Sequence, residues 1–172
     1  KSSVSLDTKF DYLADIMKWT EANECAVRCL LIKSSLYHDA GANSLQELIY
    51  TFSTVLDAIN ELLHRGVSIE VIAKHTQFSF SIGSNYFMEI AKLRAAKQIW
   101  ASLINALGGS EAAQKINVHA ITSTFNKTVY DAHVNLLRTS TEAFTAAVAG
   151  VDELSILPSA TVLERKGELG GR

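Results

Sequence analysis

The stretch "FSFSIGSNYFMEIAKLRAAKQIWASL", residues 78–103, decides the fold, because two different hydrophobic periods follow one another within it. Apolar and polar residues alternate over Phe78–Ile82, which is typical of a β-strand. From Asn85 the composition favours a helix, which we expect to run to about Leu107 and to stop at Gly108-Gly109. The stretch therefore predicts a strand that leads directly into a helix.

Helices are also predicted on both sides of this stretch. They cover residues 7–22, 44–65, 68–75 and 134–150. The long helix after residue 43 has apolar residues at a helical period over five turns, and Ser44 with Glu47 predicts a capping box at its start. Gly66 is a typical helix stop, and Ser68 is expected to be the N-cap of the short helix that follows.

Three further strands are predicted, at residues 25–35, 115–123 and 152–158. The first is short and apolar, which suits a strand buried on both faces. Strands separated by helices of this length form parallel crossovers, so the pattern predicts an α/β fold with about four parallel strands. The pattern does not choose between a small open sheet and part of a (β/α) barrel, and a full barrel normally needs about 250 residues.

The composition excludes several classes of protein. The 172 residues are 48% hydrophobic, which is enough for one domain with a substantial core. The net charge of −2 gives no reason to expect nucleic acid or a membrane as a partner, and the apolar runs are too short to span a bilayer. Cys25 and Cys29 do not form a C-x-x-C motif, so we expect buried, reduced thiols and a cytoplasmic protein.

Common catalytic motifs are absent from the sequence. It has no phosphate loop, no G-x-G-x-x-G, no G-x-S-x-G and no H-E-x-x-H, and no Cys/His cluster predicts a metal. Residues 37–39, Tyr-His-Asp, follow a predicted strand end, where they form either an acid/base group or a loop that docks on the next helix. His119 lies within a predicted strand, as a core group or a ligand. Glu89 and Lys92 are expected to pair on a solvated helix face.

The other histidines are interpreted as structural or as surface residues. His64 and His75 lie near predicted helix C-termini, where a cationic imidazole is mildly favourable. His133 is expected in a surface loop.

Residues 78–103 resemble a segment typical of the methylmalonyl-CoA mutase family, in which a barrel strand leads into a helix of the pattern F-F-x-E-I-A-K-x-R-A-A-R-x-x-W. The matching residues are Phe87, Glu89, Ile90, Ala91, Lys92, Arg94, Ala95, Ala96 and Trp100. Residues 40–48 resemble the family's A-G-A-x-x-x-Q-E-L segment, and a turn like its R-G-[LM]-x-[VI] follows at Arg65. His119 begins an H-x-x-T segment, with T, N and R at the matching spacing in Thr128, Asn135 and Arg138.

The resemblance covers about residues 10–158 and implies a partial TIM (β/α) barrel of about four parallel strands with flanking helices. We assign residues 1–158 to this unit and residues 159–172 to a tail of uncertain structure. Family members rearrange acyl-CoA carbon skeletons by a radical route that uses adenosylcobalamin. The D-x-H-x-x-G motif of their cobalamin domain is absent here, so we expect that this chain alone binds no cofactor and that adenosylcobalamin belongs to the complex.

The sequence departs from the catalytic members at positions that carry chemistry. By resemblance, Ser35-Leu36 replace a Tyr-His pair, and His75 and Gln77 replace an arginine and a serine that contact the CoA tail. Ile121 replaces a glutamine, and the family's T-A-Q-Q becomes residues 128–131, Thr-Val-Tyr-Asp. Losing these hydrogen-bonding groups resembles the small, non-catalytic subunit of heterodimeric mutases. We therefore carry over no catalytic residue and only His119 as a substrate-binding residue.

Three functions follow from the resemblance. The first is a small-subunit-like component of this isomerase that pairs with the catalytic chain as a heterodimer. The second is a catalytic acyl-CoA mutase segment with altered specificity. The third is a self-associating half barrel without ligand, because an open half barrel has strand edges that must be covered.

Overall fold

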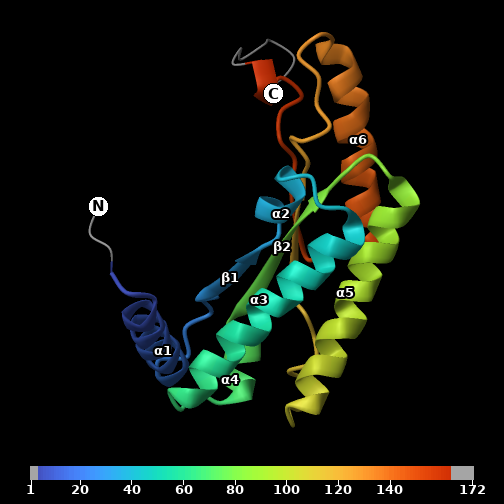
Figure 1. Ribbon diagram of the computed structural model, residues 1–172. Coiled ribbons are helices and arrows are strands. Elements are labelled where there is room, and N and C mark those ends of the chain that lie inside the picture. The colour runs from blue at the N-terminus through green and yellow to red at the C-terminus, as the bar shows by residue number, and fades with distance from the viewer. Residues whose placement is uncertain (1–3, 164–172) are drawn as a thin grey trace.

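The computed structural model describes residues 4–163, which form an α/β unit with four strands (Figure 1). In chain order its elements are α1 (Leu6–Ala22), β1 (Leu30–Lys33), α2 (Ser35–Asp39), α3 (Ser44–His64), α4 (Ile69–Lys74), β2 (Thr76–Ile82), α5 (Tyr86–Ala106), β3 (Val118–Thr122), α6 (Ala132–Ala149), β4 (Glu153–Ser155) and a 3-10 helix (Thr161–Leu163).

The four strands form one parallel sheet in the order β1-β2-β3-β4. Each strand is therefore a neighbour of the next one in the chain, as in a (β/α) barrel. The long helices α3, α5 and α6 lie together on one face of the sheet, and α1 lies beside the β1 edge (Figure 1). This arrangement confirms the predicted α/β class and corresponds to part of a TIM barrel.

The core lies between the sheet and the long helices. Phe78 and Phe80 are fully buried on β2, and Phe78 packs edge-on against Trp100 of α5 with 5.1 Å between ring centroids. Phe78 also contacts Phe52 of α3 at 5.5 Å. Because side chains alternate along a strand, Ser79, which lies between Phe78 and Phe80, points to the opposite face of the sheet. The predicted alternation over β2 is confirmed.

The first strand is shorter and more exposed than predicted. β1 covers only four residues and pairs with β2 alone, and Leu31 is 54% exposed on the face of the sheet turned away from the long helices. The prediction of burial on both faces assumed covering elements that the described residues do not supply. Cys25 and Cys29 lie before the strand as free thiols that are partly exposed, so the prediction of buried cysteines is wrong.

The start of α3 also differs from the prediction. Its N-cap is Asn43, whose side chain accepts a hydrogen bond from the Gln46 backbone, and Gln46 completes the capping box. Ser44 is the first helical residue. Glu47 cannot act as a capping partner because its side chain turns into the interior, where it is fully buried. The stop at Gly66, with φ of 74°, is confirmed.

The C-terminal tail is only partly described. The predicted tail, residues 159–172, begins with a turn and a short 3-10 helix. Residues 164–172 lie outside the described residues. Within residues 4–163, no helix combines the length and apolarity that crossing a bilayer requires.

Candidate functional site

A row of polar side chains crosses the sheet on the face turned away from the long helices. His119 lies in its centre, between Ser79 on one neighbouring strand and Ser155 on the other. Its Nδ1 atom is 2.9 Å from the Ser79 hydroxyl and its Nε2 atom is 2.8 Å from the Ser155 hydroxyl. A hydroxyl both donates and accepts, so this bridge suits any protonation state of the ring. Both nitrogens of His119 are thus bonded within the chain.

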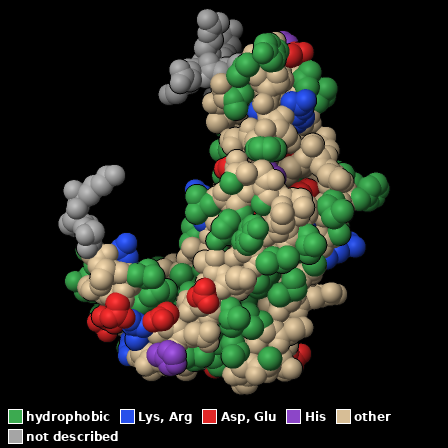
Figure 2. Space-filling model, viewed as in Figure 1, with side chains coloured by type: hydrophobic (Ala, Val, Ile, Leu, Met, Phe, Trp, Pro, Cys, Tyr) green, Lys and Arg blue, Asp and Glu red, His purple; other side chains and the backbone are tan. Residues whose placement is uncertain are grey.

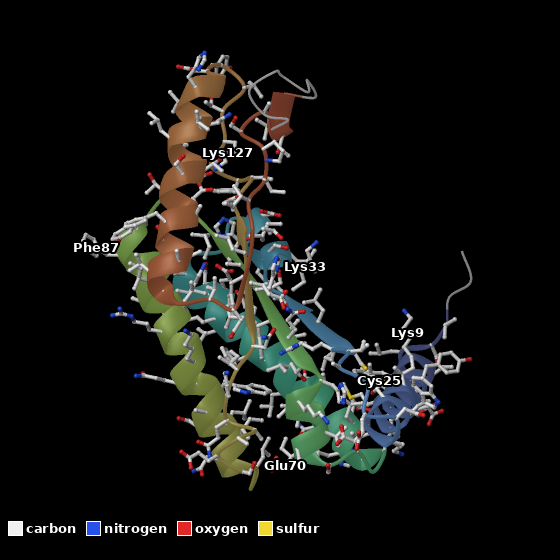
Figure 3. All side chains as sticks on the ribbon, turned by 180° about the vertical axis from the view of Figure 1, so that it is seen from behind. Lys9, Cys25, Lys33, Glu70, Phe87 and Lys127 are labelled. Carbon is white, nitrogen blue, oxygen red and sulfur yellow. The ribbon has the colours of Figure 1, made fainter. Side chains whose placement is uncertain are left out.

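The same face carries a second polar contact nearer the start of the strands. The Gln77 amide donates to the Glu153 carboxylate at 2.9 Å, which joins β2 to β4 across β3. Lys33 is exposed on β1 and projects from the face seen in Figure 3. Ile121 is half-buried on β3 and offers no hydrogen bond from its side chain. The polar groups of this face mostly bond to one another.

His75 lies before β2 and is 1% exposed. Its Nδ1 atom is 2.5 Å from the Val27 carbonyl oxygen, and its Nε2 atom is 3.2 Å from Glu21 of α1. Hydrogen bonds from Lys74 and His75 lower the pKa of the Glu21 carboxyl. His75 therefore anchors α1 and the loop before β1. This position supports its interpretation as a structural residue.

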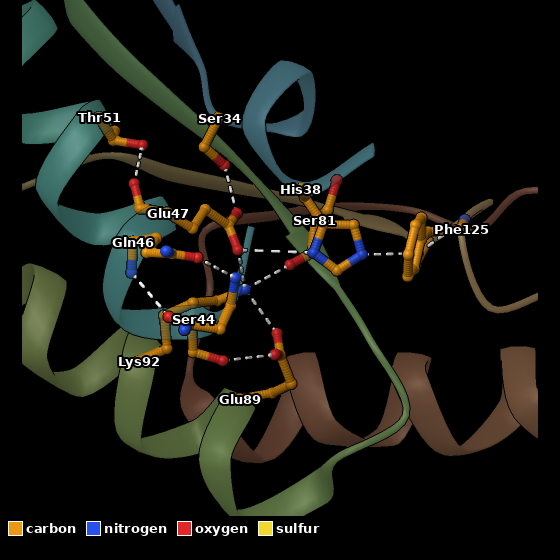
Figure 4. Close-up of polar contacts among 12 residues, drawn as sticks. Ser34, His38, Ser44, Gln46, Glu47, Thr51, Ser81, Glu89, Lys92 and Phe125 are labelled. Carbon is orange, nitrogen blue, oxygen red and sulfur yellow. Dashed lines mark hydrogen bonds and ion pairs between the residues drawn. The ribbon is translucent and has the colours of Figure 1, made fainter. Parts of the chain in front are cut away.

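A buried ionic cluster lies between β1, β2, α3 and α5 (Figure 4). The Lys92 ammonium donates to Glu47 at 2.7 Å and to the Ser81 carbonyl oxygen at 2.7 Å, and it pairs with Glu89 at 2.6 Å. The contacts with Glu47 and Ser81 are hydrogen bonds, whereas the contact with Glu89 is an ion pair without hydrogen-bond geometry. The Ser34 hydroxyl donates to the other Glu47 oxygen at 2.6 Å. Two carboxylates and one ammonium are thus removed from water together.

This cluster corrects the prediction for Glu89 and Lys92. They do pair, but their side chains are only 5% and 0% exposed, so the pair is buried rather than solvated. Lys92 lies four and eight residues before Ala96 and Trp100, both of which are buried. That spacing places Lys92 on the core side of α5 and was the sequence signal for burial. The sequence analysis missed the role of Glu47 because the capping-box pattern suggested another use.

The side chains of residues 37–39 point to different partners. The Tyr37 hydroxyl bonds to Thr54 of α3 at 2.6 Å, whereas the His38 ring points toward Glu47, 3.5 Å away, and bonds to Ser123 at 2.7 Å. Asp39 is exposed at the end of α2. The structure supports the alternative interpretation, in which this segment, a short helix rather than a loop, docks on α3.

A cleft of about 600 Å³ lies where β1, β2 and β3 end. His38, Gly83, Glu89 and Phe125 line it together with the start of α3. A side chain at Gly83 would approach the His38 ring, because a Cβ there would lie 3.3 Å from Cε1. The carboxyl ends of strands are where (β/α) proteins bind ligands. The cleft and the ionic cluster behind it are therefore the candidate site.

The residues after β3 that match the family pattern fix the loop between β3 and α6. The Asn135 amide accepts a hydrogen bond from the Thr128 backbone at 2.9 Å and donates to the Thr128 carbonyl oxygen at 2.7 Å. Arg138 donates to the Asn126 carbonyl oxygen at 2.5 Å. His133 is exposed in the first turn of α6, so its surface position is confirmed and the predicted loop is wrong. Among residues 4–163, no His, Cys, Asp and Glu side chains cluster as metal ligands.

The surroundings of Glu47 shift the pKa of its carboxyl group. Burial alone would raise its pKa, but hydrogen bonding with His38, Lys92 and Ser34, together with the positive charge of Lys92, outweighs burial and lowers the pKa of Glu47 from its ordinary value of 4.5. The unfolded chain therefore binds more protons than the folded chain in acid. The contribution of Glu47 to stability is present above pH 4.5 and is lost as the pH falls through its lower folded pKa.

We expect the free energy of unfolding to fall on acidification below about pH 5, and Glu47→Gln to reduce that slope. Urea unfolding at several pH values, followed by circular dichroism, measures how the free energy of unfolding depends on pH in both chains. Asp57→Asn removes an exposed carboxylate from the same helix and should keep the slope of the parent chain. Equal slopes for the parent chain and Glu47→Gln would contradict this account.

Taken together, the parallel sheet, the helices on one face and a cleft at the strand ends define part of a (β/α) barrel protein. The chain belongs to the methylmalonyl-CoA mutase family, whose model, described as "Methylmalonyl-CoA mutase", matches residues 1–164.

Two relatives are named methylmalonyl-CoA mutase small subunit. The protein from Porphyromonas gingivalis is 44% identical over 149 residues, which are 86% of this chain and 24% of that protein. The protein from Streptomyces virginiae is 32% identical over 151 residues, 88% of this chain and 24% of its own length. Human mitochondrial methylmalonyl-CoA mutase is 31% identical over 144 residues, 83% of this chain and 19% of its own length. The chain thus spans about a quarter or less of these relatives.

Proposed function

We propose that this chain is a small-subunit-like component of an adenosylcobalamin-dependent methylmalonyl-CoA mutase, an isomerase that rearranges an acyl-CoA. In this proposal the chain is not catalytic and acts in the cytoplasm by pairing with the catalytic chain as a heterodimer. Residues 1–158 form its part of the barrel. The observation that carries the proposal is that polar groups on the open sheet face are bonded to one another rather than free for a ligand.

The bonds at three positions support this view. His119 uses both ring nitrogens on Ser79 and Ser155, and Gln77 uses its amide on Glu153. A ligand that needs these groups must first break bonds that the protein has already made, which weakens its binding. The resemblance also expects a CoA contact at the position of His75. The ring of His75 bonds to Val27 and Glu21 instead.

The apolar replacements point the same way. Leu36, which replaces the histidine of the Tyr-His pair by resemblance, is 67% exposed and supplies no proton donor or acceptor from its side chain. Ile121 offers none on β3. A radical rearrangement needs its thioester held in one orientation, and such positioning depends on directed hydrogen bonds. The described residues lack these bonds at both positions.

Within this proposal, we expect adenosylcobalamin to be bound by parts of the complex outside this chain. His38, His75 and His119 bond to other protein groups, and residues 4–163 contain no clustered set of metal-ligating side chains. His64 and His133 are exposed on the surface. We therefore assign the cofactor to the rest of the complex.

The experiment mixes the purified chain with a catalytic mutase chain. We expect the two to co-elute in size-exclusion chromatography, and the chain alone to show no isomerisation of methylmalonyl-CoA with added adenosylcobalamin. Failure to co-elute would contradict the pairing. Isomerisation by the chain alone would contradict the non-catalytic role.

The second candidate is a catalytic segment with altered specificity, in which His119 binds the acyl-CoA. The position of His119 on the open sheet face favours it. His119→Ala decides between the two in the mixed complex, with Ser155→Ala as a control that removes one partner and keeps the ring. A raised KM in His119→Ala alone supports the second candidate, whereas unchanged kinetics in both variants remove His119 as a substrate-binding residue.

A further inference from the structure

The helix α3 is apolar on two sides. One side packs into the core through Val55, Ile59 and other fully buried residues. The outer side carries Leu45, Ile49, Leu56 and Leu63, which are 67%, 52%, 37% and 36% exposed. Ile49, Leu56 and Leu63 are seven residues apart, so they form a single line along the helix. We call Leu45, Ile49, Leu56 and Leu63 the outer seam.

A shallow groove of about 360 Å³ lies beside the outer seam, between α3 and α5. Leu45, Ile49 and Leu56 line it from α3, and Ile99 and Leu103 line it from α5. Figure 2 shows hydrophobic side chains gathered over α3 and α5, on the face that both helices present to the viewer. A helix that is apolar on its outer side normally packs against another element.

The groove is electrically neutral. None of the described residues that line it is charged, and Ser53 is the polar side chain among them. The acidic residues Asp57 and Glu61 lie on the side of α3 that faces the β1 edge, where they line a different cleft. Lys92 of α5 is buried inside the ionic cluster. Two identical copies of this face would therefore meet without repulsion between like charges.

We propose that a second copy of this chain docks on the outer seam, with α3 of each copy packed against α3 of the other about a two-fold axis. A two-fold interface uses the same patch on both copies, so the patch must be complementary to itself. A neutral, apolar seam with a heptad spacing meets that condition. Charged partner surfaces are disfavoured because the groove offers no opposite charge.

The size of the face is sufficient for a dimer. Helices of 21 residues, such as α3 and α5, are about 30 Å long, and two neighbouring helices present a face about 20 Å wide. The contact would then bury roughly 600 Å² on each copy and about 1,200 Å² in total, the lower end of the range for stable, specific interfaces. We therefore expect a dimer of micromolar rather than nanomolar affinity.

Sedimentation equilibrium of the 172-residue chain, from about 1 to 100 μM, tests the proposal. We expect a monomer–dimer equilibrium for the parent chain and a dissociation constant raised by about tenfold or more in Leu56→Glu. Leu137→Glu is the control, because Leu137 is an exposed residue of α6, 70% accessible, away from the groove. Circular dichroism verifies that both variants fold.

Cross-linking provides a second readout that does not depend on an unfavourable charge. In a background with Cys25→Ser and Cys29→Ser, Ser53→Cys should form a cross-linked dimer with a short bis-maleimide. Thr54→Cys should not form this cross-link. Thr54 is adjacent to Ser53 in the chain, but it lines the cleft on the opposite side of α3. A chain that is monomeric at every concentration, or a dimer that persists in Leu56→Glu, would overturn the proposal.

The proposal is independent of the mutase-subunit function, because self-pairing is measured on the chain alone and the heterodimer is measured in a mixture. A monomeric chain that binds the catalytic chain through a contact sensitive to Leu56→Glu would overturn self-pairing and assign the seam to that other partner. Each proposal can thus fail without the other.

Discussion

Replacing Lys92 with methionine is expected to lower the free energy of unfolding by about 3–5 kcal/mol, because it leaves buried carboxylates without their cation. Glu47 and Glu89 both contact the Lys92 ammonium within 2.7 Å, and both are nearly inaccessible to water. Methionine fills a similar volume but supplies no charge and no donor. Urea unfolding at neutral pH, followed by circular dichroism, measures the loss.

Two controls separate this charge effect from a packing effect. The triple variant Lys92→Met, Glu47→Gln and Glu89→Gln removes the carboxylates as well, and it should recover much of the lost stability. Lys74→Met removes a cation that pairs with Glu21 at the surface, where its side chain is 54% exposed, and should have a much smaller effect. A triple variant no more stable than Lys92→Met would mean that packing, rather than charge, dominates.

Replacing Phe78 with alanine is expected to cost about 3–5 kcal/mol, because it opens a cavity at the centre of the core. Phe78 is 0% exposed, and its ring contacts Phe52, Phe80 and Trp100. These partners come from α3, β2 and α5, so they cannot all move inward to fill the space. The midpoint of urea unfolding, at an unchanged m-value, measures the loss.

Phe87→Ala is the matched control for this change. It removes the same ring from the first turn of α5, where Phe87 is 80% exposed and projects from the surface (Figure 3). We expect a change of about half a kcal/mol or less. A loss comparable to that of Phe78→Ala would show that the ring of Phe87 is covered in solution, contrary to the exposure described above.

The fold was largely predictable because its elements have strong local signals. The alternation over β2 and the glycine after α3 each identify an element without knowledge of its neighbours. β1 was predicted less well because its length and burial depend on the elements beside it. A strand of hydrophobic residues was assumed to be covered on both faces, and Leu31 shows that the face turned away from the long helices is open among the described residues.

The candidate site was less predictable than the fold. A charged residue on a helix is usually solvated, and only the helical register of Lys92 with Ala96 and Trp100 argued otherwise. The partners of His119 could not be inferred either, because Ser79 and Ser155 are 40 and 36 residues away in the chain. Register between parallel strands brings these three side chains together, and sequence pattern alone does not fix that register.

The ionic cluster also determines how the chain can be divided. A cut in the turn at Gly66 looks harmless, because it falls between two α/β repeats. It would nevertheless leave Glu47 and Ser34 in one fragment and Lys92 and Glu89 in the other. Each fragment would then hold ionised groups that water solvates, and this water must be removed again before the halves can rejoin. The repeats are therefore interdependent, and the smallest piece that keeps the cluster whole extends from residue 34 to residue 92.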